Sequence, residues 1–72
     1  MSDRKMEFKE KYTLKDEENE KKHVNLFFTN GEVYSGIFAG MDGDDTIMLD
    51  AENNKGRIGL PMNLLKNYAI EA

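Results

Sequence analysis

The segment from residue 23 to residue 52 constrains this chain most, because short extended runs alternate there with tight turns. In the run 23–29, apolar side chains fall at every second position, which is typical of a strand with one buried face. Asn30 and Gly31 follow at once, and this dipeptide tolerates the positive φ angles of a tight hairpin turn. The chain is therefore predicted to double back here, as the first hairpin of a mainly β fold.

The returning run, residues 32–41, is long for a strand and contains Gly36 and Gly40. Glycines inside a strand weaken a flat sheet, but they permit sharp bending and close approach of another backbone. A second turn is predicted at residues 42–45, and the run 46–51 alternates again between apolar and polar positions. The three runs predict a bent meander that curls toward a small barrel.

The C-terminal quarter predicts two further strands. Residues 51–56 have the asparagines and glycine of a loop. The run 57–62 alternates, and Pro61 lacks a backbone donor, so it belongs at a strand end, a bulge or an edge. The run 64–70 follows as the last strand.

Glycines, aromatic residues and acids in the first half of this region have a distinctive spacing, carried by Leu26, Asn30, Gly31, Tyr34, Gly36, Phe38, Gly40 and Asp42, then Ile47, Leu49, Asp50 and Ala51. This pattern resembles the first sequence signature of the Sm/LSm family, which includes bacterial Hfq-like proteins. The resemblance covers residues 24–70 and implies a small, strongly bent, five-stranded antiparallel Sm-like (SH3-like) barrel behind a short N-terminal helix. It also implies a homo-oligomeric ring that binds RNA.

The beginning of the chain allows two interpretations. A strand would place Phe8, Glu10, Tyr12 and Leu14 at a period of two. A helix capped by Asp3 would instead dock Met6 and Phe8 on the barrel rim, with Tyr12 one turn later. The resemblance favours the helix.

The charged run at residues 15–22 is expected to be a solvated connector in either case. The sequence therefore divides into a charged N-terminal segment, residues 1–22, and an Sm-like β-barrel domain, residues 23–72.

The length of the chain favours self-association. A domain of 72 residues buries a small fraction of its surface, and the absence of cysteine removes disulfides as a supplement to the core. Unpaired strand edges can instead extend their ladder onto identical copies, and a head-to-tail contact can close into a ring. By the resemblance, a ring of about five to seven subunits would join the fourth strand of one copy to the last strand of the next. The expected contact residues are Arg57, Ile58, Leu60, Met62, Tyr68 and Ile70.

Charge is unevenly distributed along the chain, whose formal net charge is −4. Residues 1–22 hold seven bases and seven acids, whereas residues 23–72 hold three bases and seven acids. Basic groups that displace phosphate counterions supply most non-specific affinity for nucleic acids. A barrel this acidic is therefore not expected to bind RNA indiscriminately.

The family's RNA site implies particular positions in this chain. In Sm-like proteins, the loop after the second strand presents a ring that stacks on a base and an asparagine that bonds its edge. These positions fall here on Asp44 and Thr46, and the arginine of the second signature falls on Pro61. Since a carboxylate has no π face, the site would be a non-standard one. We expect its residues to be Asp44, Thr46, Asn63 and Lys66.

Three functions remain open on the residues alone. The preferred one is an RNA-associated ring, with a role in RNA binding, processing or chaperoning. The second is an acidic ring that serves as a scaffold for a basic protein. The third is a monomeric, SH3-like peptide-binding module, which would need an exposed groove made by Phe27, Tyr34, Phe38 and Tyr68.

Other classes of function find little support. The sequence has neither a nucleophile motif nor a glycine-rich phosphate loop, so no enzyme activity and no cofactor is expected. The acids Asp42, Asp44, Asp45 and Asp50 lack the spacing of a calcium loop, and a single histidine cannot build a zinc site, so no metal is expected. With no apolar run near about 18 residues and no secretory signal, the protein is expected to be cytoplasmic, without a membrane partner.

Overall fold

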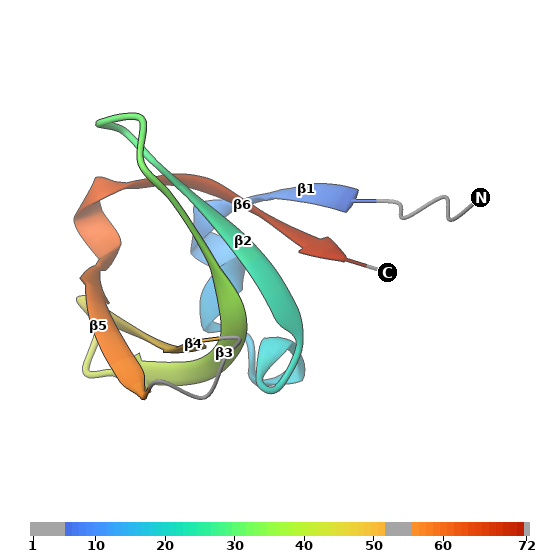
Figure 1. Ribbon diagram of the computed structural model, residues 1–72, viewed down its shortest axis with the longest axis vertical. Helices are drawn as coiled ribbons and strands as arrows, with labels where there is room; N and C mark the ends of the chain where they lie inside the picture. The colour runs from blue at the N-terminus through green and yellow to red at the C-terminus, as the bar shows by residue number, and fades with distance from the viewer. Residues whose placement is uncertain (1–5, 52–55, 72) are drawn as a thin grey trace.

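A computed structural model describes residues 6–51 and 56–71 of the chain. These residues form one open antiparallel sheet of six strands in the order β1-β6-β2-β3-β4-β5 (Figure 1). The strands are β1 (Met6–Glu10), β2 (His23–Phe28), β3 (Val33–Asp42), β4 (Thr46–Ala51), β5 (Arg57–Pro61) and β6 (Leu65–Glu71). Three short 3₁₀ helices connect them: η1 (Lys11–Lys15), η2 (Glu17–Asn19) and η3 (Met62–Leu64). The prediction of a mainly β fold is confirmed.

The tight turn predicted between β2 and β3 is present. Gly31 has a φ of +90°, and the amide of Phe28 donates to the Glu32 carbonyl over 2.9 Å. The Asn30 side chain supports the turn twice, because its amide donates to the Glu32 carboxylate at 2.8 Å and its oxygen accepts from the Glu32 amide at 3.0 Å. Local side-chain chemistry therefore fixes this hairpin.

The bend predicted from the two glycines of β3 is confirmed as well, and Figure 1 shows β3 as a long curved strand. A Cβ atom on Gly36 would lie 2.4 Å from the backbone oxygen of Asp50 on β4, so only glycine fits there. Gly40 has a φ of +99°, and the register between β3 and β4 shifts between Phe38 and Met41. A bulge with a left-handed glycine thus turns the sheet toward itself.

The predicted N-terminal helix is wrong over the described residues, since Met6–Glu10 is a strand and no α-helix occurs in the part of the chain that the structure describes. β1 runs antiparallel to β6, with Met6 opposite Glu71 and Glu10 opposite Asn67. A short isolated helix is marginal in water, whereas the edge of β6 supplies hydrogen-bond partners to an extended segment. The expected cap at Asp3 lies outside the described residues.

The predicted five-stranded closed barrel is also wrong in strand number and in closure. Strands β2 to β6 correspond to the five predicted runs, and β1 adds a sixth strand. A strand has two hydrogen-bonding edges, and β6 uses one for β2 and the other for β1. No edge of β6 remains for β5, which precedes β6 in the chain and is joined to it by η3. The sheet therefore curls but stays open, with β1 and β5 at its ends.

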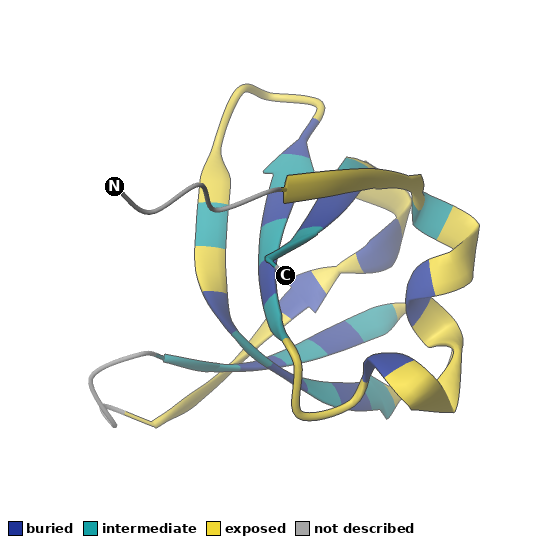
Figure 2. Ribbon diagram, turned by 90° about the vertical axis from the view of Figure 1, so that its right-hand side faces the viewer, coloured by how far each residue is buried: buried dark blue, intermediate teal, exposed yellow. Residues whose placement is uncertain are grey.

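The core lies inside the curl, and Figure 2 shows buried and less buried residues alternating along the central strands. The predicted alternation holds for β2, in which every second residue is buried. Pro61 is the last residue of β5, as its missing donor predicts. The buried hydrophobic residues are Leu14, Val24, Leu26, Phe28, Phe38, Ile47, Leu49, Leu60, Met62, Leu65, Tyr68 and Ala69.

Two residues ahead of β2 are also buried: Leu14 of η1 is fully buried, and Asn19 of η2 is 3% exposed. Asn19 lies in the run 15–22, so the prediction of a solvated connector is wrong at this residue. The other residues of the charged run 15–22 are exposed, as predicted. Of the loop predicted at residues 51–56, Ala51 is instead the last residue of β4, and its amide donates to the Gly56 carbonyl at 3.1 Å. Residues 52–55 lie outside the described residues.

Candidate functional site

Two of the residues predicted to contact RNA lie together at one end of the sheet. Thr46 begins β4 and Asn63 lies in η3, and both line a hollow of about 450 Å³ with Asp45 and Leu60. The backbone carbonyl of Asp45 accepts the Met62 amide at 2.8 Å, which holds η3 against the β3–β4 turn. Asp44 is exposed in this turn.

The chemistry of this hollow is acidic and polar. Its lining includes the carboxylate of Asp45, which accepts the Thr46 hydroxyl at 3.2 Å, but neither an aromatic ring nor a cation. A nucleotide base would find no ring on which to stack, and a phosphate would meet a negative charge. Hydrogen bonds from Thr46 and Asn63 are what this hollow can offer to a ligand.

Lys66, the fourth residue predicted to contact RNA, lies elsewhere. It is exposed on β6 and lines a different hollow, of about 530 Å³, at the junction of β1, η1 and β6. The structure therefore does not bring Lys66 together with Thr46 and Asn63. We call this second hollow the β1–η1 hollow, and its lining residues are Phe8, Lys9, Glu10, Lys11, Tyr12, Lys66 and Asn67.

Sequence reasoning did not single out the β1–η1 hollow. Its walls combine the strongly exposed rings of Phe8 and Tyr12, 62% and 71% exposed, with lysines. The ammonium of Lys11 lies 5.4 Å from the centroid of the Tyr12 ring. The signal available in the sequence was the interleaving of aromatic and basic residues from Phe8 to Tyr12, but the contribution of β6 appears only in the fold.

The residues predicted for the ring contact divide into two groups. Leu60, Met62 and Tyr68 belong to the protomer's own core, and Ile70 packs against it. Arg57 and Ile58 are exposed on β5, one of the two edge strands. Whether copies of the chain meet through these residues stays a prediction, but their backbone positions differ: β5 has an open edge, whereas β6 is paired on both sides.

An ion pair lies at the start of β5. Arg57 Nε donates to Asp50 Oδ1 at 2.7 Å and Nη2 donates to Oδ2 at 3.3 Å, so the contact is bidentate. The hydrogen bond from Arg57, and to a smaller extent its charge, lowers the pKa of the Asp50 carboxyl below its ordinary value. This pair joins the edge strand to β4, where the two residues are register partners.

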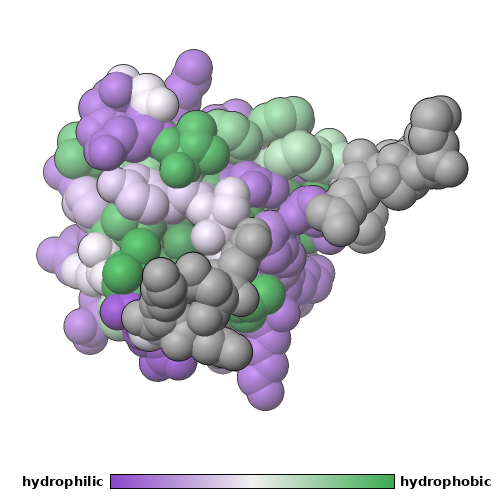
Figure 3. Space-filling model, viewed as in Figure 1, coloured by the Kyte–Doolittle hydropathy of each residue, from purple (hydrophilic) through white to green (hydrophobic). Residues whose placement is uncertain are grey.

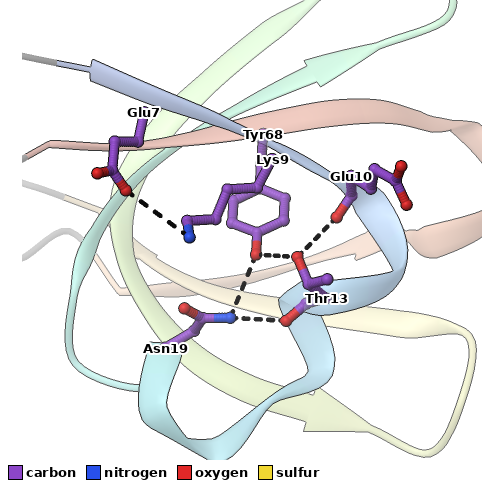
Figure 4. A network of polar contacts seen from close by, with 6 residues as sticks. All are labelled: Glu7, Lys9, Glu10, Thr13, Asn19 and Tyr68. Atoms are coloured by element: carbon purple, nitrogen blue, oxygen red, sulfur yellow. Dashed lines mark hydrogen bonds and ion pairs between the residues drawn. The ribbon is translucent and has the colours of Figure 1, made fainter.

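Tyr68 serves as an internal anchor, as Figure 4 shows. Its hydroxyl lies 2.5 Å from the Thr13 hydroxyl and accepts the Asn19 side-chain amide at 3.3 Å. The same amide donates to the Thr13 carbonyl at 2.7 Å, and the Thr13 hydroxyl donates to the Glu10 carbonyl at 2.8 Å. These hydrogen bonds tie η1 and η2 to β6.

The exposed groove required by a peptide-binding module is not formed. Phe38 and Tyr68 are buried, at 1% and 0% exposure. Tyr34 packs edge-on against Phe28, with ring centroids 5.5 Å apart. Phe27 instead meets Phe8, with centroids 5.6 Å apart, on the outer face of the sheet.

This outer face carries an apolar strip. Val33 is the register partner of Phe27, so the two side chains lie on the same face. Met6 lies two residues before Phe8 on β1 and therefore shares the face of Phe8. Met6 is 41% and Val33 55% exposed. Figure 3 shows hydrophobic side chains along the upper part of the molecule, between the β2–β3 turn and β1.

The part of the chain that the structure describes brings no three histidine or acidic side chains together as metal ligands. Within residues 6–51 and 56–71, no helix combines the length and hydrophobicity needed to cross a membrane. No protein-family model matches this chain, and no curated protein or solved structure is significantly similar to it. The Sm-like resemblance therefore stays a prediction drawn from the sequence signature.

Proposed function

We propose that this chain is a non-enzymatic, Sm-like β module that assembles with copies of itself through its sheet edges and, as an assembly, associates with single-stranded RNA. The observation that carries the assembly is the strand order, which leaves β1 and β5 as the two ends of an open sheet. Each open edge presents unpaired backbone donors and acceptors.

The contact we propose is head to tail. Because β1 occupies the second edge of β6, the strand offered to β5 of the next copy is β1 rather than the last strand. Such a contact uses two different edges, so successive copies extend the ladder and a suitable rotation closes a ring. The Sm-like resemblance also predicts a ring, but with the last strand in the place that β1 takes here.

The assembly is tested by placing a charge on an edge strand. Ile58 is 41% exposed on β5, and Ile58→Lys introduces a residue that natural edge strands use against pairing. Light scattering should give a reduced mass for this variant. Val33→Lys is the matched control, because Val33 is 55% exposed on β3, an internal strand, and this variant should keep the mass of the parent protein. Equal masses for both variants would contradict assembly through β5.

The association with RNA comes from the resemblance to the Sm/LSm family and is tested by titration. Short oligouridine or oligoadenine should bind, and the affinity should fall when salt rises from about 50 to 200 mM, because phosphate contacts release counterions. Absence of any salt-dependent binding would end the RNA proposal while leaving self-assembly intact.

A second candidate function is a scaffold for a basic protein. The observation that favours it is an exposed acidic turn, in which Asp42 ends β3 and Asp44 and Asp45 follow it. Among the described residues, no lysine or arginine is found as a hydrogen-bond partner of these three side chains. Repetition around a ring would concentrate this negative charge. A lysine-rich peptide that binds the assembly, and loses affinity in the variant Asp44→Asn, Asp45→Asn, would favour the scaffold.

A further inference from the structure

We propose that the β1–η1 hollow is the single-stranded RNA site of this chain, with a base stacked on Tyr12 and the backbone phosphates held by Lys11 and Lys66. This inference rests on the RNA association proposed above and moves its site away from the β3–β4 turn. It would place the site on segments that belong to the N-terminal part of the chain and to the last strand.

The shape of the hollow suits one unstacked nucleotide and its neighbours. Its volume of about 530 Å³ falls within the usual range for small-ligand sites, about 300 to 1,000 Å³. It opens on the surface between β1, η1 and β6, so a strand of RNA can run past it. Tyr12 is 71% exposed, which leaves most of its ring available to a base.

The charges around the hollow suit a phosphate backbone. Lys9, Lys11 and Lys66 line it, against the single acid Glu10. Lys9 lies 3.7 Å from Glu7 and shares its charge with that carboxylate, so Lys11 and Lys66 are the cations most available to a ligand.

Lys66 is also distinctive within the acidic half of the chain. Of the three bases after residue 22, Lys55 lies outside the described residues and Arg57 is bonded to Asp50 in a bidentate pair. Within residues 6–51 and 56–71, no acidic side chain forms an ion pair with Lys66, which lines the hollow together with the exposed rings of Phe8 and Tyr12.

The combination of rings and cations distinguishes RNA from an acidic peptide. Single-stranded nucleic acids are held by stacking platforms together with a positive groove, whereas an acidic peptide would use the lysines alone. Lys11 already lies over the Tyr12 ring at 5.4 Å, so the cation and the platform are adjacent. Asn67 adds an amide that can bond a base edge. The hollow near Thr46 has neither a ring nor a cation.

The experiment compares variants of the full chain by fluorescence anisotropy with labelled oligouridine and oligoadenine. Tyr12→Leu should weaken binding at least about fivefold, which is the lower end of one stacking contact, while Tyr12→Phe should bind like the parent protein. Lys66→Glu should also weaken binding and should lower the salt slope by about one or more. Lys15→Glu is the matched control, because this exposed lysine of η1 makes the same charge change outside the hollow.

Several results would overturn the inference, and they separate it from the proposed function. If the parent chain binds RNA and both Tyr12→Leu and Lys66→Glu bind equally well, RNA is bound elsewhere and only this site fails. If Lys66→Glu and Lys15→Glu weaken binding equally, the effect is one of net charge and the hollow is not a site. Tighter binding of polyglutamate than of either oligonucleotide would assign the hollow to an acidic peptide. A parent chain that binds neither oligonucleotide would end the RNA association itself, while its mass by light scattering still reports on assembly.

Discussion

Asn19 shows how one polar side chain can organise a segment that looks unstructured in sequence. It is buried, and its amide bonds the Thr13 carbonyl and the Tyr68 hydroxyl. Removing a buried partner leaves other polar groups unsatisfied, at a cost of about 1 to 3 kcal/mol. We expect Asn19→Ala to lower the free energy of unfolding by about this amount in urea denaturation. Glu18→Ala, at the exposed neighbour, should leave it nearly unchanged, and equal losses for both variants would contradict the anchoring role.

Gly36 tests the close approach of β3 and β4. Because a Cβ atom at this position would lie 2.4 Å from the Asp50 backbone oxygen, Gly36→Ala forces two paired strands apart. Overpacking of this kind typically costs about 1 to 3 kcal/mol, and we expect a loss of stability in that range or above it. Ser35→Ala, on the exposed side of the same strand, is the comparison in thermal unfolding. A stable Gly36→Ala protein would show that the strands can separate without cost.

The pair of Asp50 and Arg57 predicts how stability depends on acid. The pKa of Asp50 is lowered in the folded state, chiefly by the hydrogen bond from Arg57, relative to an ordinary value of 3.8. Its contribution is therefore present above that ordinary value and is lost as the pH falls through the lower folded-state pKa. We expect the difference in unfolding midpoint between the parent and Asp50→Asn to shrink over this acidic range. A difference independent of pH would mean that the carboxylate charge is not involved.

Among the elements, β1 determines which strand forms one end of the sheet, because it covers the outer edge of β6. It pairs only with β6, and all five of its residues are exposed. Removing residues 1–10 would uncover the edge of β6, which the sequence predicts as the ring contact. If assembly uses β1, we expect light scattering to find fewer subunits per particle for the truncated chain than for the parent protein. Retention of the parent number of subunits would contradict a contact that needs β1.

Elements that depend on nearby residues in the sequence were predictable, whereas elements that depend on distant parts of the chain were not. The β2–β3 hairpin was predictable, because Asn30, Gly31 and the alternation of apolar residues are local signals. β1 was not, because it is entirely exposed and pairs with a strand at the other end of the chain. The resemblance to a family with an N-terminal helix also weighted the choice against the strand.

The candidate sites divide in the same way. Thr46 and Asn63, both predicted as RNA contacts, lie together because the β3–β4 turn contacts η3, and their role stays a prediction. The β1–η1 hollow was not anticipated, since Lys66 and Tyr12 line the same hollow only after β1 has paired with β6. Asn19 was missed because nothing in a charged run marks one amide as buried.

At the scale of the whole molecule, a small chain without cysteine ends its sheet in two open edges. Domains of this size bury a modest fraction of their surface, so pairing those edges with copies would add stability as well as a repeated binding surface. Unfolding should then depend on protein concentration, with a midpoint that rises as the protein is concentrated. A midpoint that is constant across dilution would indicate that folding and assembly are not coupled.

Sedimentation equilibrium of the parent chain at micromolar concentration distinguishes an assembly from a single folded chain. We expect a folded species whose mass is at least twice 8.3 kDa, the mass of one chain. A single folded species of 8.3 kDa over the same concentrations would contradict assembly through the sheet edges.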